Sequence, residues 1–134
     1  MTKTAVQILE EHAIKPSVQR IEVVKYLLQN RIHPTADDIF SALQPEMPTL
    51  SRTTIYNVLR VLVDGGVVRE LYIDDRNVRY DIMVKPHAHF RCRRCGKIID
   101  LPMPELSNVD CQLSIDEVEV YYYGICEDCK RMLP

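Results

Sequence analysis

SRTTIYNVLRVLVDGG, residues 51–66, is the stretch that decides the fold of the N-terminal half of the chain. Ser51 is a typical N-cap residue and Gly65-Gly66 a typical helix end, so the stretch predicts a helix with defined ends. One face carries apolar residues at the spacing of a buried stripe, and another arc is mostly polar. The stripe comprises Ile55, Val58, Leu59, Leu62 and Val63, and the other arc comprises Thr53, Tyr56, Asn57 and Arg60.

Three helices are expected upstream of this one. Residues 4–12 predict a short first helix, and Ser17 is the expected N-cap of a second, whose apolar residues follow helical spacing. Thr35 starts a third helix. Asp38, three residues on, gives a weak form of the capping box and suits the positive end of that helix.

Two β-like runs follow, residues 67–73 and 77–84, and residues 74–76 join them as an expected hairpin. Three helices that end in a recognition helix, followed by a hairpin, are typical of a winged helix-turn-helix DNA-binding domain, and here the short first helix precedes that three-helix unit. We therefore predict such a domain over residues 1–84. The alternative is a generic helical domain that carries a hairpin.

The pattern changes after Lys85-Pro86. Residues 85–134 contain three short strand-like segments, HAHFRC, KIIDL and EVEVYYYGIC, which predict a second, smaller domain. The predicted fold class of the whole chain is therefore α+β.

Four of the five cysteines form two pairs with metal-ligand spacing, Cys92 with Cys95 and Cys126 with Cys129. Two such turns can place four sulfurs around one tetrahedral ion, and an all-thiolate shell favours a structural zinc. The alternatives are unrelated turns, a redox pair or an iron–sulfur cluster. Cys111 is left over and is expected to be a buried or free thiol.

The cellular compartment of the protein decides whether these cysteines are more readily oxidised or bound to a metal. Residues 1–11 lack the basic start and apolar block of a signal peptide, and no stretch approaches the roughly 20 apolar residues of a membrane-spanning helix. We therefore expect a cytoplasmic protein with no membrane partner, in which thiols stay reduced and available to a metal.

The net charge of −2 does not by itself indicate a nucleic-acid partner. Residues 47–63, however, contain no acid and carry Arg52 and Arg60. A local basic patch of this kind can be sufficient if a dimer doubles it.

His87 and His89 lie just before the first cysteine pair. On an extended strand, residues i and i+2 face the same side, so both imidazoles can reach one ion. Their position favours metal ligation over ordinary surface or core roles.

Taken together, the motifs resemble those of the ferric uptake regulator (Fur) family over nearly the whole chain. The matching motifs are Gln19-Arg20, His33 with the PTADDIF run, Thr54-Ile55-Tyr56, Arg79-Tyr80-Asp81, His87-x-His89 and both cysteine pairs. The resemblance implies a metal-dependent repressor, homodimeric through the C-terminal domain, that binds a pseudo-palindromic operator in double-stranded DNA. It also implies a regulatory metal between the domains, with ligands His33, Asp81, His87, His89 and Asp100. Such donors suit Fe(II), Mn(II) or Zn(II), and the choice stays open.

Asp100 and Asn57 make the chain most similar to the peroxide-sensing members, PerR, because iron-uptake regulators usually carry Glu and Arg there. The resemblance implies that Fe(II) and hydrogen peroxide oxidise His33 or His87, after which metal and DNA are released. This event has no turnover, so no enzyme is expected. The rivals are an iron- or zinc-uptake repressor, a non-haem iron enzyme and a zinc-ribbon interaction module.

Two departures from the family pattern lead to further expectations. The segment between the two cysteine pairs is shorter than in familiar members of the family, so the dimerisation helix expected near residues 103–113 is short and the dimer can differ in detail. No histidine precedes the last strand, so no third metal site is expected.

The exposed arc of the recognition helix predicts the DNA contacts. Tyr56 can pack on a thymine methyl group, and Asn57 can pair with adenine. The side chains expected at phosphates are Arg52, Thr54 and Arg60, with Lys15 at a phosphate or in the minor groove.

Overall fold

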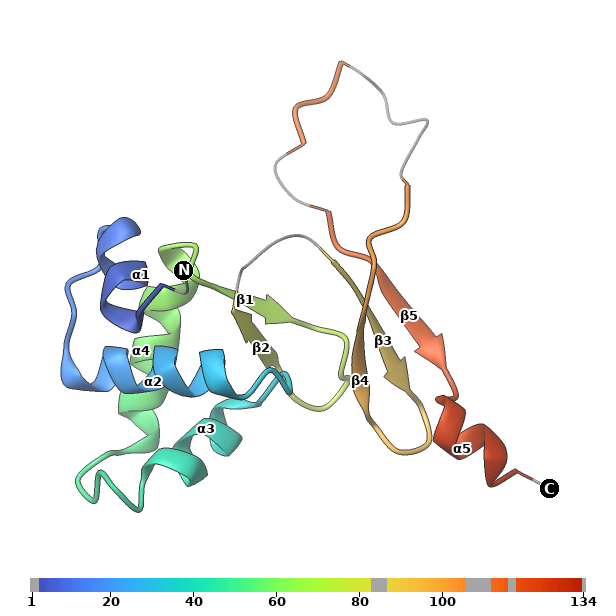
Figure 1. The fold of residues 1–134 in the computed structure, drawn as a ribbon, viewed down its shortest axis with the longest axis horizontal. Helices are drawn as coiled ribbons and strands as arrows, with labels where there is room; N and C mark the ends of the chain where they lie inside the picture. The colour runs from blue at the N-terminus through green and yellow to red at the C-terminus, as the bar shows by residue number, and fades with distance from the viewer. Residues whose placement is uncertain (1–2, 83–86, 106–111, 116–117, 134) are drawn as a thin grey trace. The chain divides into compact units, whose positions relative to one another are not determined.

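The computed structural model describes residues 3–82, 87–105, 112–115 and 118–133. The chain divides into two compact units, Met1–Val84 and Lys85–Pro134 (Figure 1). Each unit has its own secondary structure, and each is described by itself below.

Residues 3–82 of the N-terminal unit contain four helices, each capped by a hydroxyl side chain. Thr4, Ser17, Thr35 and Ser51 each accept a hydrogen bond from the backbone N–H three residues on. At Thr35 the capping box is complete, because Asp38 also accepts from the backbone N–H of Thr35. The predicted starts of the last three helices are therefore confirmed. The helices are α1 (Ala5–Glu11), α2 (Val18–Gln29), α3 (Ala36–Leu43) and α4 (Arg52–Asp64).

Helix α1 ends in a Schellman motif with an alanine at its left-handed position. Ala13 has a φ of 58°, its N–H donates to the carbonyl of Glu10, and the N–H of Ile14 donates to the carbonyl of Leu9. Glycine is the usual residue here, because a Cβ is disfavoured at positive φ. Ile14 and Leu9 are both buried in the core, which is the apolar contact that accompanies this motif.

Helix α4 ends in the same motif with a glycine. Gly66 has a φ of 80°, its N–H donates to Val63, and the N–H of Val67 donates to Leu62. The preceding residue, Gly65, lies close to the side chain of Ile14. A Cβ at Gly65 would lie 2.5 Å from the terminal methyl group of Ile14, so a larger residue there requires the Ile14 side chain to shift.

Helix α4 packs its apolar stripe into the core and is followed by the wing. Strands β1 (Val68–Leu71) and β2 (Arg79–Ile82) pair antiparallel, with Val68 opposite Ile82. Of the predicted stripe, Ile55, Val58, Leu59 and Leu62 are buried together with residues of all three other helices, while Val63 is partly exposed and packs against this cluster. The winged helix-turn-helix fold is thereby confirmed.

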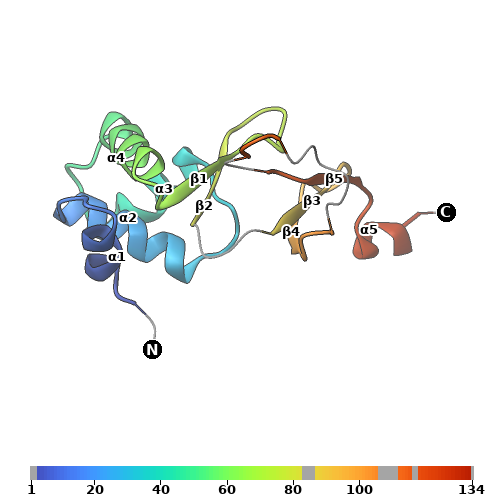
Figure 2. The ribbon, with the colours of Figure 1, turned by 90° about the horizontal axis from the view of Figure 1, so that it is seen from above.

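The C-terminal unit contains a three-stranded sheet in the order β4-β3-β5. Strand β3 (Ala88–Cys92) pairs antiparallel with β4 (Ile98–Leu101) and parallel with β5 (Tyr121–Gly124). A short helix, α5 (Glu127–Arg131), follows β5, as the rotated view in Figure 2 shows. The sequence did not predict this helix.

The segment 103–113, where a dimerisation helix was expected, lies partly outside the described residues. Cys111 lies outside them. Over the described residues, no helix is long and apolar enough to cross a membrane.

Candidate metal sites and DNA-binding surface

The four predicted thiolate ligands come together in the C-terminal unit. The sulfurs of Cys92, Cys95, Cys126 and Cys129 all lie within 4.8 Å of one another, and those of Cys95 and Cys126 are 3.8 Å apart. Zinc–sulfur bonds of about 2.3 Å in a regular tetrahedron place the sulfurs about 3.8 Å apart. A disulfide requires a separation of about 2.05 Å, and the four cysteines form none. The donor set and its spacing therefore fit a closed tetrahedral zinc site.

The first sulfur pair is held by a tight turn at the end of β3. The N–H of Cys92 donates to Lys97, and the N–H of Gly96 donates to the carbonyl of Cys92. Gly96 has a φ of 78°, which the turn requires and which glycine adopts without strain.

The second sulfur pair lies on α5. Cys126 is the residue before the first turn of this helix, and Cys129 is buried within it. Parallel pairing brings Gly124 opposite Cys92 and carries the chain directly to Cys126.

Backbone hydrogen bonds favour the thiolate form at Cys92. The N–H groups of Cys95 and Cys126 donate to its sulfur at 3.5 and 3.3 Å and lower the pKa of Cys92 to about 6. Burial acts in the opposite direction at Cys129 and, with hydrogen bonds among the thiols, raises its pKa to about 12. A bound cation favours deprotonation of all four thiols, because thiolates are the metal-ligating form.

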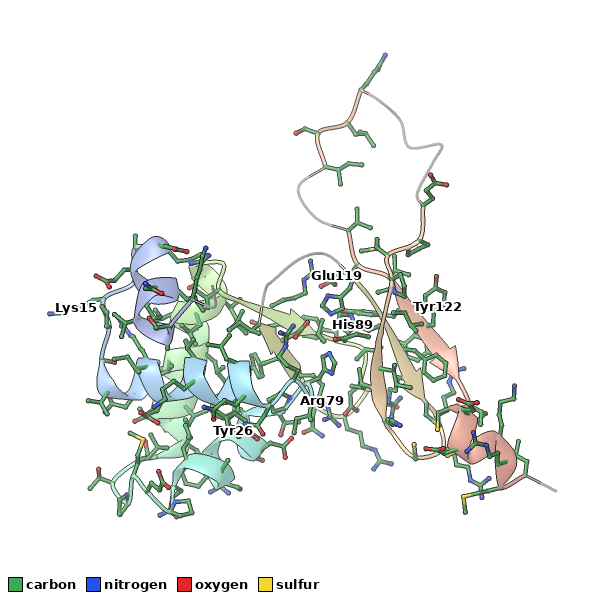
Figure 3. The ribbon with its side chains drawn as sticks, in the orientation of Figure 1. Lys15, Tyr26, Arg79, His89, Glu119 and Tyr122 are labelled. Atoms are coloured by element: carbon green, nitrogen blue, oxygen red, sulfur yellow. The ribbon has the colours of Figure 1, made fainter. Side chains whose placement is uncertain are left out.

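A second group of donors lies near the start of β3, the strand that ends at Cys92. His89 on β3 faces Asp100 on β4 directly across the ladder, and Nε2 of His89 lies 3.5 Å from Oδ1 of Asp100. Nε2 of His87 lies 3.3 Å from the same oxygen, and the two imidazole centres are 4.4 Å apart. His89, labelled in Figure 3, is only 1% exposed. As predicted from their i and i+2 spacing, the two imidazoles lie close enough to share an ion.

Two further candidate ligands belong to the N-terminal unit. His33 lies in the segment between α2 and α3 and is 3% exposed, and Asp81 lies in β2 and is 5% exposed. A buried imidazole and a buried carboxylate are donors that Fe(II), Mn(II) and Zn(II) all accept. His33 also has a φ of 57°, a left-handed conformation that few residues other than glycine adopt.

The predicted DNA contacts lie on or near the N-terminal half of α4. Tyr56 is 53% exposed, and Asn57 and Arg60 are exposed beside it. Arg52 is exposed as well, with its Nε 3.2 Å from Oδ1 of Asp37 and its guanidinium over the ring of Phe40.

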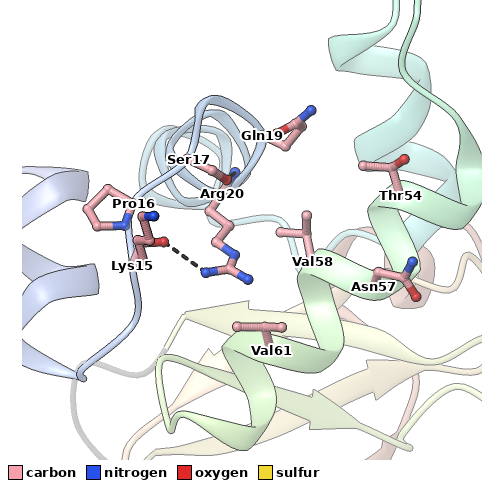
Figure 4. A pocket seen from close by; sticks show the side chains of 9 residues that line it. All are labelled: Lys15, Pro16, Ser17, Gln19, Arg20, Thr54, Asn57, Val58 and Val61. Carbon is pink, nitrogen blue, oxygen red and sulfur yellow. Dashed lines mark hydrogen bonds between the residues drawn. The ribbon is translucent and has the colours of Figure 1, made fainter.

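A groove of about 440 Å³ separates this face of α4 from the start of α2 (Figure 4). Lys15 and Ser17 line one side of it, and Thr54 and Asn57 line the other. Arg20 reaches between them and donates a hydrogen bond of 2.8 Å to the carbonyl of Lys15. The groove therefore brings together three predicted DNA contacts, and it adds Arg20, which entered the sequence analysis only as part of a family motif.

The comparisons with known proteins agree with this architecture. The sequence pattern described as "Ferric uptake regulator family" matches residues 11–125. The peroxide-responsive repressor PerR of Staphylococcus epidermidis is 38% identical over 130 residues, which cover 92% of this chain and 86% of that protein.

Two solved structures are also similar. A structure of PerR from Streptococcus pyogenes, whose subject is peroxide sensing and gene regulation, is 34% identical with a TM-score of 0.55, covering 96% of this chain and 95% of that one. The Helicobacter pylori ferric uptake regulator has a TM-score of 0.74 at 22% identity, covers 97% of each chain, and supports the fold alone.

A small winged-helix unit followed by a sheet with a four-thiolate cluster defines a class of metal-dependent regulators. The chain belongs to the ferric uptake regulator family. It is accordingly a regulator and not an enzyme, and its relatives include a peroxide-responsive repressor and the peroxide operon regulator of Bacillus subtilis.

Proposed function

We propose that this chain is a PerR-type repressor that holds one structural zinc ion and one regulatory Fe(II) or Mn(II) ion. The observation that carries the proposal is the cluster of His87, His89 and Asp100, in a chain 38% identical to a peroxide-responsive repressor. Asp100 is the residue by which the sequence resembles the peroxide-sensing subgroup.

Zinc is the proposed occupant of the four-thiolate site. The shell is complete with four sulfurs, so it leaves no open position for chemistry. Its proposed role is to fix the end of β3 to α5, and thereby to fix the strand that carries His89.

The regulatory site is proposed to combine ligands from both units. His33 and Asp81 would come from the DNA-binding unit, and His87, His89 and Asp100 from the other. Zn(II) can substitute for Fe(II) or Mn(II) at such a donor set. An ion that binds one arrangement of the two units more tightly shifts the population towards it, which couples metal binding to DNA binding.

Fe(II), when bound, would supply the electrons that reduce hydrogen peroxide. The imidazoles of His33 and His87 are the proposed targets of the resulting oxidation. An imidazole that has gained oxygen is a poorer ligand, so the metal affinity of the site falls and the repressor leaves its operator.

DNA recognition is assigned to α4 in the major groove. Tyr56 and Asn57 are proposed to contact base edges. A homodimer presents two such helices and therefore requires a pseudo-palindromic site. The proposed phosphate contacts are Lys15, Arg52, Thr54 and Arg60.

The test loads zinc-replete protein with Fe(II) under anaerobic conditions, adds hydrogen peroxide, and measures peptide masses and operator binding. We expect a gain of one oxygen, 16 Da, on peptides that carry His33 or His87, with loss of operator binding. Mn(II)-loaded protein is the matched control and should show neither change. Retained operator binding without added oxygen would exclude the peroxide function and favour a metal-uptake repressor.

A further inference from the structure

Arg79, at the start of β2, connects three segments of the N-terminal unit. Its Nε and Nη2 donate to Oδ2 of Asp74 at 3.1 and 3.0 Å, and its Nη1 donates to the backbone carbonyl of His33 at 3.2 Å. The ion pair is largely sheltered, since the side chains of Asp74 and Arg79 are 8% and 23% exposed. Arg79 is labelled in Figure 3.

Asp74 belongs to the wing loop, residues 72–78, between β1 and β2. Its second oxygen, Oδ1, accepts a hydrogen bond of 2.9 Å from the N–H of Arg76 and so closes the turn at the tip. One carboxylate therefore organises the wing loop with one oxygen and holds Arg79 with the other.

The segment that carries His33 is fastened to β2 at two consecutive residues. Arg79 donates to the carbonyl of His33, and the N–H of Tyr80 donates to the carbonyl of Pro34 at 2.9 Å. The left-handed backbone of His33 is disfavoured for a residue with a Cβ, and strained residues persist only where their surroundings hold them. These two hydrogen bonds restrain the backbone on the carbonyl side of His33.

We propose that Arg79 is the positioning residue for the regulatory metal: it holds His33 in the ligating conformation and links that conformation to the wing loop through Asp74. The inference rests on the proposed role of His33 as a ligand. Arg79 does not touch the metal in this scheme and acts only through His33.

A guanidinium suits this role better than an ammonium. Its N–H groups point in fixed, divergent directions, so Arg79 can donate to Asp74 and to His33 at the same time. Lysine at this position retains the charge opposite Asp74, but a single ammonium on a flexible stem does not hold both partners.

The experiment measures Mn(II) affinity, by electron paramagnetic resonance of the free ion, on full-length protein with the four-thiolate site filled with zinc. The variants are Arg79→Met, Arg79→Lys and His33→Ala, together with Arg79→Met and Arg79→Lys in the His33→Ala background. Lys25→Met, which removes an exposed ion pair with Glu22 on α2, is the control.

We expect Arg79→Met and Arg79→Lys each to weaken Mn(II) binding about tenfold, the usual effect of losing a residue that orients a ligand. In the His33→Ala background the same changes should have no further effect, because their route to the metal is gone. General damage to the fold would weaken binding in both backgrounds. Where Arg79→Met fails to fold, Arg79→Lys carries the same comparison.

Two outcomes would overturn the inference, and they differ from each other. Wild-type affinity in the Arg79 variants, beside weakened binding in His33→Ala, would remove the positioning role and leave the proposed ligand set intact. Unchanged affinity in His33→Ala would show that His33 is not a ligand, and the regulatory site and the role of Arg79 would both fall.

Discussion

The backbone N–H of Cys126 donates a hydrogen bond of 3.3 Å to the sulfur of Cys92, across 34 positions of the chain. The same sulfur accepts from the N–H of Cys95. Cys92 is thus the sulfur at which the two halves of the cluster meet, and it is completely buried.

Replacement of Cys92 by serine should abolish zinc binding and unfold the C-terminal unit. A hydroxyl supplies no thiolate to the ion, and structural zinc contributes its binding free energy to folding. Zinc content per chain and the hydrogen exchange of β3 and β5 amides are the measurements. Cys111→Ser is the matched control and should keep its zinc. Full zinc content in Cys92→Ser would contradict the four-thiolate site.

The two Schellman motifs allow a reciprocal test of backbone strain within one domain. Ala13→Gly should stabilise the N-terminal unit by about 1 kcal/mol, because it removes a Cβ from a left-handed residue. Gly66→Ala should destabilise it by about the same amount, because it adds a Cβ to a left-handed residue. Steric overlap is not the cause, since the nearest atom to the added Cβ belongs to the ring of His12, at 3.9 Å. Chemical denaturation of both variants provides the free energies of unfolding. A destabilised Ala13→Gly variant would argue against strain at that position.

His33 provides a similar comparison at a proposed functional residue. His33→Gly and His33→Ala both remove the imidazole, but only glycine adopts a φ of 57° without strain. Without the regulatory metal, His33→Gly should therefore be more stable than His33→Ala by about 1 kcal/mol. Thermal unfolding of the zinc-bound proteins measures this difference. Equal stability would show that the left-handed backbone is not costly here.

Tyr80 predicts how stability depends on alkaline pH. Burial, reinforced by the charge of Glu70, raises the pKa of Tyr80 to about 12, from the ordinary value of about 10. The unfolded chain releases this proton first, so the stabilisation is fully present below pH 10 and is lost as the pH rises towards 12. Tyr80→Phe should therefore show a shallower fall in the free energy of unfolding over this range, measured by urea denaturation at each pH. Parallel curves for both proteins would contradict the assignment.

Asn57 and Arg60 should affect DNA binding differently. Asn57→Ala should reduce discrimination at one base pair by about 1–3 kcal/mol and leave the salt dependence unchanged. Arg60→Met should weaken binding to all sequences alike and lower the slope against salt concentration by about one. Titrations of operator and scrambled DNA at several salt concentrations separate the two. A selective loss at one base pair in Arg60→Met would reverse the assigned roles.

Local features of the fold were predictable from the sequence, and features that depend on distant contacts were not. Ser17, Thr35 and Ser51 cap helices through residues three positions away, so short patterns revealed them. Helix α5 is only five residues long and carries no apolar stripe, so no periodicity predicted it. The parallel pairing of β3 with β5 depends on a register that no local pattern specifies.

The candidate sites show the same contrast. Cysteine spacing predicted one cluster, and the alternation of His87 and His89 predicted part of another. Asp81 and His33 were identified as candidate metal ligands only through the family resemblance, since neither stands in a motif that indicates a metal by itself. The role of Arg79 depends on a contact with His33, 46 positions earlier, and spacing alone gave no sign of it.

The wide separation of the two cysteine pairs also sets the order in which the protein matures. At roughly 5–20 residues per second, the ribosome adds Cys126 about 2–7 s after Cys92. The growing chain therefore contains two of the four site thiols before it contains the other two, and a two-thiol half-site cannot form the closed tetrahedron. The proposed zinc site can therefore be completed only after residues 126–129 have been made, when the whole winged-helix unit has already been synthesised.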